Sequence, residues 1–283
     1  MMLFSSVLPM AEPVAAFTGI FSGVVIIHEA GHYLAARCFG VPVAEFCIGF
    51  PGTPVILTLW RYGETSFTVR LLPFGGFVRF GDDGNTGCAK GTGEDSKSAG
   101  SDGEDSITTG EEGTADFESL PPGNKAAILI AGSLFNLVAG ACLMVSAIMA
   151  IKGLCFLDAT AAVISLAGMV VKETFSALLH CDLSGFSGPV GAAGITRDVM
   201  AKGLWPLVGF AGLMSFSMGI MNLLPVPGFD GGHVVLAGIE AVRGRPLSGR
   251  FQALAGAASF AVVVVLMVAV TCHDVIIVLS SSH

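Results

Sequence analysis

Long apolar runs dominate the chain, and four of them are long enough to cross a membrane. A helix needs roughly 20 mostly apolar residues to span the hydrocarbon core of a bilayer. The pattern predicts four such helices, at about 14–36, 126–151, 204–224 and 252–279. A shorter apolar run, 159–171, ends in Lys172 and Glu173. We expect it to form a helix that lies at the interface or packs on the bundle.

A different periodicity follows the first predicted span. Residues 55–60 and 66–71 flank a turn that contains Gly63, which predicts a β-hairpin, and an apolar, glycine-rich stretch follows at 72–80. Strand edges cannot be left exposed to lipid, so we expect these strands within the protein, at the surface or beside a water-filled cavity. A free edge there could bind an extended peptide. A purely structural hairpin that covers the bundle explains the pattern equally well.

Composition agrees with a membrane protein. The chain is 53% hydrophobic and only 13% charged, against roughly 25% charged residues in soluble domains. Of its 22 acidic residues, 11 lie between Asp82 and Glu118. This Gly-, Ser- and Thr-rich insert is expected to be a disordered cytoplasmic loop; metal binding by its acids is the less favoured alternative. The rest of the chain is nearly neutral, so no nucleic-acid partner is indicated.

The seven cysteines have no C-x-x-C spacing, so they indicate neither a disulfide framework nor a thiolate zinc site. A bridge between Cys155 and Cys181 is possible, but two free thiols are the favoured interpretation. The N-terminus lacks the basic flank of a secretory signal, so we expect the first apolar run to be a retained anchor.

Positive charge predicts the orientation in the membrane. The connection between the first and second spans has seven Lys and Arg, that between the third and fourth has three, and that between the second and third has four. The first and third connections together have ten basic residues, and the second has four. The two more basic connections are therefore expected in the cytoplasm, which puts both termini outside.

The run from His28 to His32 reads H-E-x-x-H and lies within the first predicted span. On a helix this spacing puts two imidazoles one turn apart, where both can bind one zinc ion, with the Glu29 carboxylate beside them. Ionisable groups at membrane depth are costly and usually mark function. His28 lies nine residues before Arg37, which is about 14 Å of helix. The motif is therefore expected within the bilayer, nearer the cytoplasmic face.

Two histidines leave a catalytic zinc site incomplete, because such sites usually have three protein ligands and a water. In one known zinc-binding pattern a third histidine follows the motif, but the positions where it would stand hold Ala35 and Cys38. In another pattern the third ligand is a downstream Glu in E-x-x-x-D, and no Glu in this chain has that context. The remaining candidate is the segment 222–233, where Pro225 and Pro227 end the third helix. Its one acid is Asp230.

Five motifs together resemble the site-2 proteases, a family of intramembrane zinc metalloproteases, and most closely the bacterial regulator-of-sigma-E protease branch. In family order they are HEAGH at 28–32, LPFGGF at 72–77, AGSLFN at 131–136, SGPV at 187–190 and NLLPVPGFDGGH at 222–233. Two features depart from that branch. Ser133 stands where the family often has proline, and the connection 152–203 is too short to hold the PDZ domains typical of the branch beside the SGPV motif.

The resemblance implies one catalytic Zn²⁺ held by His28, His32 and Asp230, with Glu29 as general base. It also implies that an unwound substrate is held by strand residues and two side-chain amides: Phe74, Gly75, Gly76, Phe77, Asn136 and Asn222. Interhelical hydrogen bonding is an equally good interpretation of each asparagine. The expected substrates are transmembrane segments of membrane-anchored proteins, cleaved in regulated proteolysis, or leftover signal peptides. The expected location is a bacterial inner membrane, in contact with its lipid.

Two other functions stay open. A membrane zinc transporter would need a second set of ligands along a path, and His180, His273 and His283 are too scattered to form one. An inactive, substrate-binding relative is disfavoured by the intact Glu29. His233 either interacts with the metal ligands without binding the metal itself, or is an ordinary capped or surface histidine.

The sequence thus predicts a membrane α-helical fold of four transmembrane helices with a membrane-associated β-hairpin and re-entrant strands on the cytoplasmic side. The expected segments are the first helix with HEAGH at 1–40, the β region at 41–81, the acidic loop at 82–123, the second helix at 124–152, an external connection without a PDZ domain at 153–203, the third helix and DGG loop at 204–233, a cytoplasmic loop at 234–251 and the fourth helix at 252–283.

Overall fold

The computed structural model describes most of the chain, namely residues 2–50, 53–71, 75–81, 117, 120–180, 188–226, 228–245, 247, 251, 254, 256–258, 261, 264–265, 267–272 and 274. Its helices and strands follow in the order α1 (Met2–Cys38), β1 (Val43–Ile48), β2 (Val55–Tyr62), β3 (Thr65–Arg70), β4 (Gly76–Phe80), α2 (Pro122–Lys152), α3 (Phe156–His180), α4 (Pro189–Met200), α5 (Leu204–Leu223) and α6 (Asp230–Arg243).

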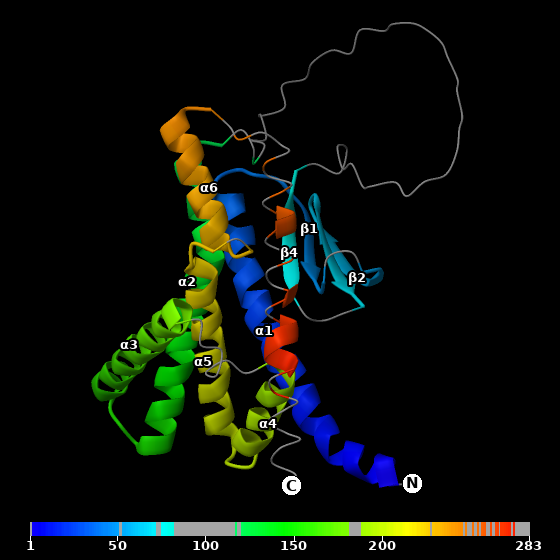
Figure 1. Cartoon of the computed structure of the whole chain (residues 1–283), viewed down its shortest axis with the longest axis vertical. Coiled ribbons are helices and arrows are strands. Elements are labelled where there is room, and N and C mark those ends of the chain that lie inside the picture. The colour runs from blue at the N-terminus through cyan, green and yellow to red at the C-terminus, as the bar shows by residue number, and fades with distance from the viewer. Residues whose placement is uncertain are drawn as a thin grey trace, which may run out of the picture.

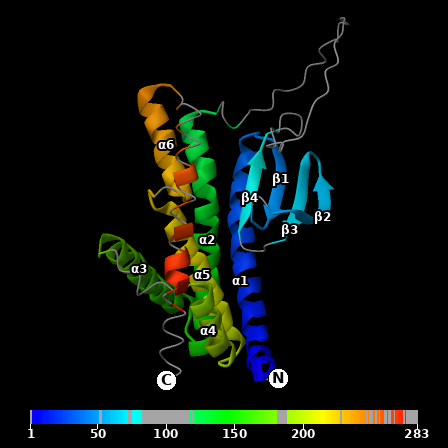
Figure 2. The same cartoon turned by 45° about the vertical axis from the view of Figure 1, so that its right-hand side comes forward.

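Helices α1, α2 and α5 form a bundle whose long axes run side by side (Figures 1 and 2). Within the described residues, three segments are long and apolar enough to cross a membrane: Ala11–Cys38, Pro122–Lys152 and Leu204–Leu223. They correspond to the first three predicted spans. The fourth, 252–279, lies largely outside the described residues, although those described between 251 and 274 are helical.

Small residues let α2 and α5 approach closely. A Cβ atom at Gly140 would lie 2.7 Å from the carbonyl oxygen of Gly212, and one at Gly219 would lie 2.8 Å from that of Ser133. Apolar side chains gain little by leaving lipid for a helix interface, so close backbone packing is the main source of attraction between membrane helices. Any larger residue at these glycines would push the two helices apart.

The strands form one mixed sheet in the order β2-β3-β1-β4, which lies against the C-terminal half of α1 (Figures 1 and 2). The predicted hairpin is confirmed as the antiparallel pair β2–β3, and its turn has Gly63 at φ 60°. Strand β1, which the sequence pattern did not reveal, lies between β3 and β4 and is parallel to β3. It is buried on both faces, so it shows no apolar–polar alternation.

The central strand holds a buried charge that the sheet neutralises. Glu45 is only 5% exposed. Its carboxylate accepts a hydrogen bond of 2.6 Å from Thr68 and lies 3.2 Å and 3.3 Å from the guanidinium groups of Arg70 and Arg79. A buried carboxylate needs such partners, because an unpaired charge would be very costly there. The arrangement ties β1 to both neighbouring strands.

The remaining helices surround the bundle. Helix α3 leaves the bundle at a steep angle in both views (Figures 1 and 2). The predicted helix at 159–171 is thus present, but it is longer than expected, from Phe156 to His180; its place at the membrane interface stays a prediction. Helix α4 was not predicted; Gly191 at its start donates a hydrogen bond of 2.9 Å to Asp274. Residues 234–243 of the expected cytoplasmic loop belong to α6.

The possible bridge between Cys155 and Cys181 stays untested. Cys155 is a free thiol, and Cys181 lies outside the described residues.

Candidate metal centre

The H-E-x-x-H motif lies on α1 as its spacing predicts. His28 and His32 are one turn apart, with Nε2 atoms separated by 3.1 Å and rings that meet edge to face at 4.7 Å between centroids. Both side chains are buried, and so is Glu29 between them. A continuous helix therefore presents two imidazoles to one point without help from any loop.

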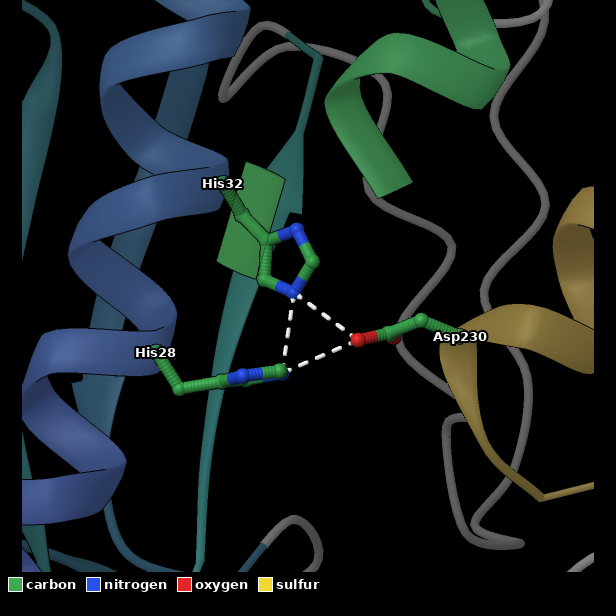
Figure 3. A group of neighbouring side chains, drawn as sticks. All are labelled: His28, His32 and Asp230. Atoms are coloured by element: carbon green, nitrogen blue, oxygen red, sulfur yellow. Dashed lines mark hydrogen bonds and ion pairs between the residues drawn. The ribbon is translucent and has the colours of Figure 1, made fainter. Parts of the chain in front are cut away.

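Asp230 reaches the same point from a segment almost 200 residues away. Helix α5 ends at Leu223, and after an irregular stretch α6 begins at Asp230. Its Oδ2 atom lies 3.0 Å from Nε2 of His28 and 3.4 Å from Nε2 of His32 (Figure 3). One ligand atom from each residue lies within 4.8 Å of the others, so the three side chains could hold a metal ion.

The spacing of these atoms fits zinc. Four ligands at 2.0–2.1 Å around a tetrahedral ion lie about 3.3 Å from one another. The three observed separations are 3.0, 3.1 and 3.4 Å. Oδ2 of Asp230 is buried and has no hydrogen-bond partner among the described residues, despite its nearness to both rings. Nε2 of His28, Nε2 of His32 and Oδ2 of Asp230 therefore lie at the mutual distances expected of three ligands of one cation.

The charge of Asp230 also suits a cation. Burial raises the pKa of this carboxyl, but the two neighbouring imidazoles lower it by more, so its pKa lies below the ordinary value. The side chain keeps 20% of its surface exposed, whereas the two histidine side chains keep 6% and 9%. An ionised carboxylate that faces two imidazole nitrogens matches the donor set of catalytic zinc sites.

Helix α2 orients His32. The Nδ1 atom of His32 lies 2.8 Å from the carbonyl oxygen of Ile128, to which it donates when its proton is on Nδ1. Such a bond leaves the lone pair of Nε2 free for a metal. The two helices can cross this closely only through glycine: a Cβ atom at Gly31 would lie 2.6 Å from the carbonyl oxygen of Ala131, and one at Gly132 would collide with the His32 ring.

The predicted substrate-binding residues have different surroundings. Asn136 is fully buried, with Nδ2 3.3 Å from Nδ1 of His28. Asn222 is partly exposed in the last turn of α5. Gly76, at the start of β4, lies against α1, where a Cβ atom would be 2.8 Å from Cγ of Glu29. Phe77 lies under the Arg70 guanidinium, 5.1 Å from its ring centroid. Gly75 has φ 108°, and Phe74 lies outside the described residues.

His233 lies one turn after Asp230 but faces a cavity of about 230 Å³ between α2 and α6. Lys125 and Glu240 also line this cavity, and their charged groups lie 3.6 Å apart. This pair and the Ile128 carbonyl were missed from the sequence. A backbone carbonyl has no sequence signature, and one Lys and one Glu that are 115 residues apart have none as a pair.

Known proteins similar to this chain are peptidases. The model of the family described as Peptidase family M50 matches residues 16–266. Zinc metalloprotease RasP of Shouchella clausii is 32% identical over 120 residues, which is 42% of this chain and 27% of that protein. Regulator of sigma-W protease RasP of Bacillus subtilis is 35% identical over 118 residues, 42% of this chain and 26% of that protein. The matches thus span about a quarter of the length of these relatives.

Proposed function

This chain belongs to peptidase family M50, and from that membership we propose that it is an intramembrane zinc metalloprotease that hydrolyses peptide bonds in the transmembrane segments of membrane-anchored proteins. The observation that carries the proposal is the convergence of His28, His32 and Asp230, from two distant helices, on one point beside the Glu29 carboxylate. An acid next to a three-ligand zinc site is the arrangement by which metalloproteases activate water.

In this proposal the three ligands hold one Zn²⁺, and Glu29 is the general base. When bound, Zn²⁺ would supply Lewis-acid chemistry: it would activate the attacking water and polarise the carbonyl of the scissile bond. Glu29 would accept a proton from the attacking water and deliver it to the leaving amine. Its buried position beside both histidines keeps bulk water away from the carboxylate, which favours proton transfer to the substrate.

Strand β4 is proposed to hold the unwound substrate. It is the last strand in the sheet order, so one of its edges has no strand partner within the described part of the chain. An extended peptide can pair with such an edge by main-chain hydrogen bonds. Gly76, the first residue of β4, lies close to Glu29, and Gly75 and Phe77 flank it in the chain. Phe74 and the partly exposed residue Asn222 complete the proposed substrate contacts.

We further propose the membrane arrangement predicted from sequence: four spans, including 252–279, with both termini outside and the metal centre near the cytoplasmic face. The described helices agree with three spans, and the matching relatives are bacterial proteins, so the chain is assigned to a bacterial inner membrane. One relative is named a regulator of sigma-W protease. Membrane-anchored regulators of transcription are therefore the proposed substrates, with signal peptides as the second class.

The test uses the full chain, reconstituted in liposomes with a single-span model substrate. The parent should cut the substrate and lose activity when zinc is removed, and Glu29→Gln should lose activity by about 10²–10⁴-fold, the usual contribution of a general base, while it still binds zinc. Zinc flux into the liposomes that is unaffected by Glu29→Gln would identify a transporter instead. Binding of the substrate without any cleavage by the parent would identify an inactive relative. Either result would overturn the proposal.

A further inference from the structure

The two imidazoles of the metal centre are oriented by different kinds of partner. Nδ1 of His32 faces a backbone carbonyl, that of Ile128, at 2.8 Å. Nδ1 of His28 faces a side chain, the amide of Asn136, at 3.3 Å. A carbonyl oxygen can only accept a hydrogen bond, so it fixes one ring tautomer. A side-chain amide can offer either an acceptor or a donor, so it can select between two.

The choice of tautomer decides whether His28 can bind a metal. Neutral histidine carries one proton, and Nε2 can offer its lone pair to a cation only when that proton is on Nδ1. Nδ1 is then a donor and needs an acceptor. With Nδ2 of Asn136 toward the ring, the amide would donate to Nδ1 and the proton would occupy Nε2, which points at Asp230. A half-turn of the amide brings its oxygen to Nδ1 instead.

Ser215 on α5 can satisfy the amide after that turn. Its hydroxyl donates to the backbone carbonyl of Asn136 at 3.0 Å and lies 3.4 Å from the side-chain oxygen Oδ1. When the amide turns, its NH₂ group takes the place of Oδ1 and can donate to the Ser215 oxygen. Asn136 and Ser215 have no exposed surface, so each buried polar group must find its partner within this cluster.

We propose that Asn136 is a positioning residue for the metal centre: its amide oxygen accepts the Nδ1 proton of His28 and so keeps Nε2 of that ring available to Zn²⁺, with Ser215 holding the amide in place. The inference rests on the proposed function, since it concerns the same zinc site. It gives Asn136 a task that needs no contact with substrate, which its complete burial favours. Asn222, partly exposed, remains the substrate-binding candidate.

The experiment measures zinc affinity of the full chain in detergent by competition with a chelator. Asn136→Leu keeps the size of the side chain and removes the acceptor, and we expect it to lower the affinity by about 10- to 100-fold, the usual effect of losing such a partner. Asn136→Asp keeps an acceptor and should restore the affinity to within a few-fold of the parent. With Co²⁺ in place of zinc, the absorption spectrum of Asn136→Leu should resemble that of His28→Ala, and that of Asn136→Asp should resemble the parent.

Two readouts separate the possible failures. Thermal unfolding of the zinc-free proteins should be alike in the parent and Asn136→Leu; if that variant does not fold, Asn136→Ala takes its place. Unchanged zinc affinity in the variant that lacks the acceptor overturns the inference, and so does an Asn136→Asp protein that binds as weakly as Asn136→Leu. Equal zinc binding by the parent and His28→Ala would instead refute the ligand set of the proposed function.

Discussion

The two halves of the metal centre are built in different ways. On the α1 half, His28, Glu29 and His32 belong to one continuous helix and are all buried. On the other half, Asp230 is the first residue of the 14-residue helix α6, follows an irregular segment, and keeps 20% of its side chain exposed. The first half is ordered by local helix geometry, whereas the second depends on contacts with distant parts of the chain.

Three contacts fix the α6 half. A Cβ atom at Gly231 would collide with the carbonyl oxygens of Leu223 and Leu224, so only glycine lets α6 start this close to the end of α5. Glu240 lies 3.6 Å from Lys125 of α2 and accepts a hydrogen bond of 2.9 Å from the backbone of Leu247. Asp230 is the first residue of α6 and has no preceding helical turn to hold it. These contacts therefore determine where its carboxylate lies.

The largest difference between the halves should appear when Asp230 is replaced by alanine. Zinc sites with four protein ligands bind with about 10–16 kcal/mol, or roughly 3 kcal/mol per ligand, so the loss of one ligand should lower zinc affinity by roughly 100-fold. Amide hydrogen exchange in 224–243 should also accelerate, while exchange in α1 near His28 stays unchanged. Asp198→Ala removes an exposed acid and serves as the control. Equal acceleration in both halves would show that they are not ordered independently.

Gly231→Ala should have the next largest effect. The added methyl meets backbone carbonyls, which cannot move aside cheaply, so Asp230 must shift. Displacement of a catalytic group by about 1 Å can lower the rate by 10²-fold, and we expect a loss of that order in cleavage of the model substrate. Gly238→Ala, on the same helix with open space around it, should leave the rate unchanged. A Gly231→Ala protein with full activity would mean that α6 is not fixed at this contact.

The matching change on the α1 half is Gly132→Ala. Here the methyl would overlap Nε2 of His32, the atom proposed to bind zinc, so the ring must move by about 1 Å. Because the obstacle is the end of a side chain and not backbone, it can move at lower cost than the carbonyls at Gly231, and we expect a loss of activity no larger than that of Gly231→Ala, about 10- to 10²-fold. Gly123→Ala, on the same helix and without close neighbours, is the control. If Gly132→Ala were more damaging than Gly231→Ala, the α1 half would be the less tolerant one, contrary to the comparison.

The α1 half of the metal centre could be predicted from sequence better than the α6 half. The spacing of His28 and His32 was sufficient to predict that their rings meet, because one helical turn fixes their separation. The apolar runs were sufficient to predict helices α1, α2 and α5. Asp230 was found as the only acid in the proline-broken segment 222–233, but the helix that it begins was expected to be a loop. Strand β1 escaped notice because burial on both faces removes the alternation that marks a strand. The Asn136–His28 contact joins residues 108 positions apart, and no local pattern records it.

The smallest expected effect concerns the ion pair that holds α6 on α2. Glu240→Gln removes the carboxylate that faces Lys125, and Lys125→Met removes the ammonium group that faces Glu240, so either single change should loosen α6. Since Asp230 lies ten residues from this pair, at the other end of the helix, we expect only a several-fold loss of zinc affinity.

The double variant Lys125→Met, Glu240→Met should recover much of the lost zinc affinity, because replacing a buried pair by apolar residues is often neutral. Zinc affinities of the parent, both single variants and the double variant measure this coupling directly. If both single variants bind zinc as the parent does, the pair does not contribute to the position of Asp230, and the Gly231 contact and the Glu240–Leu247 hydrogen bond must hold the α6 half.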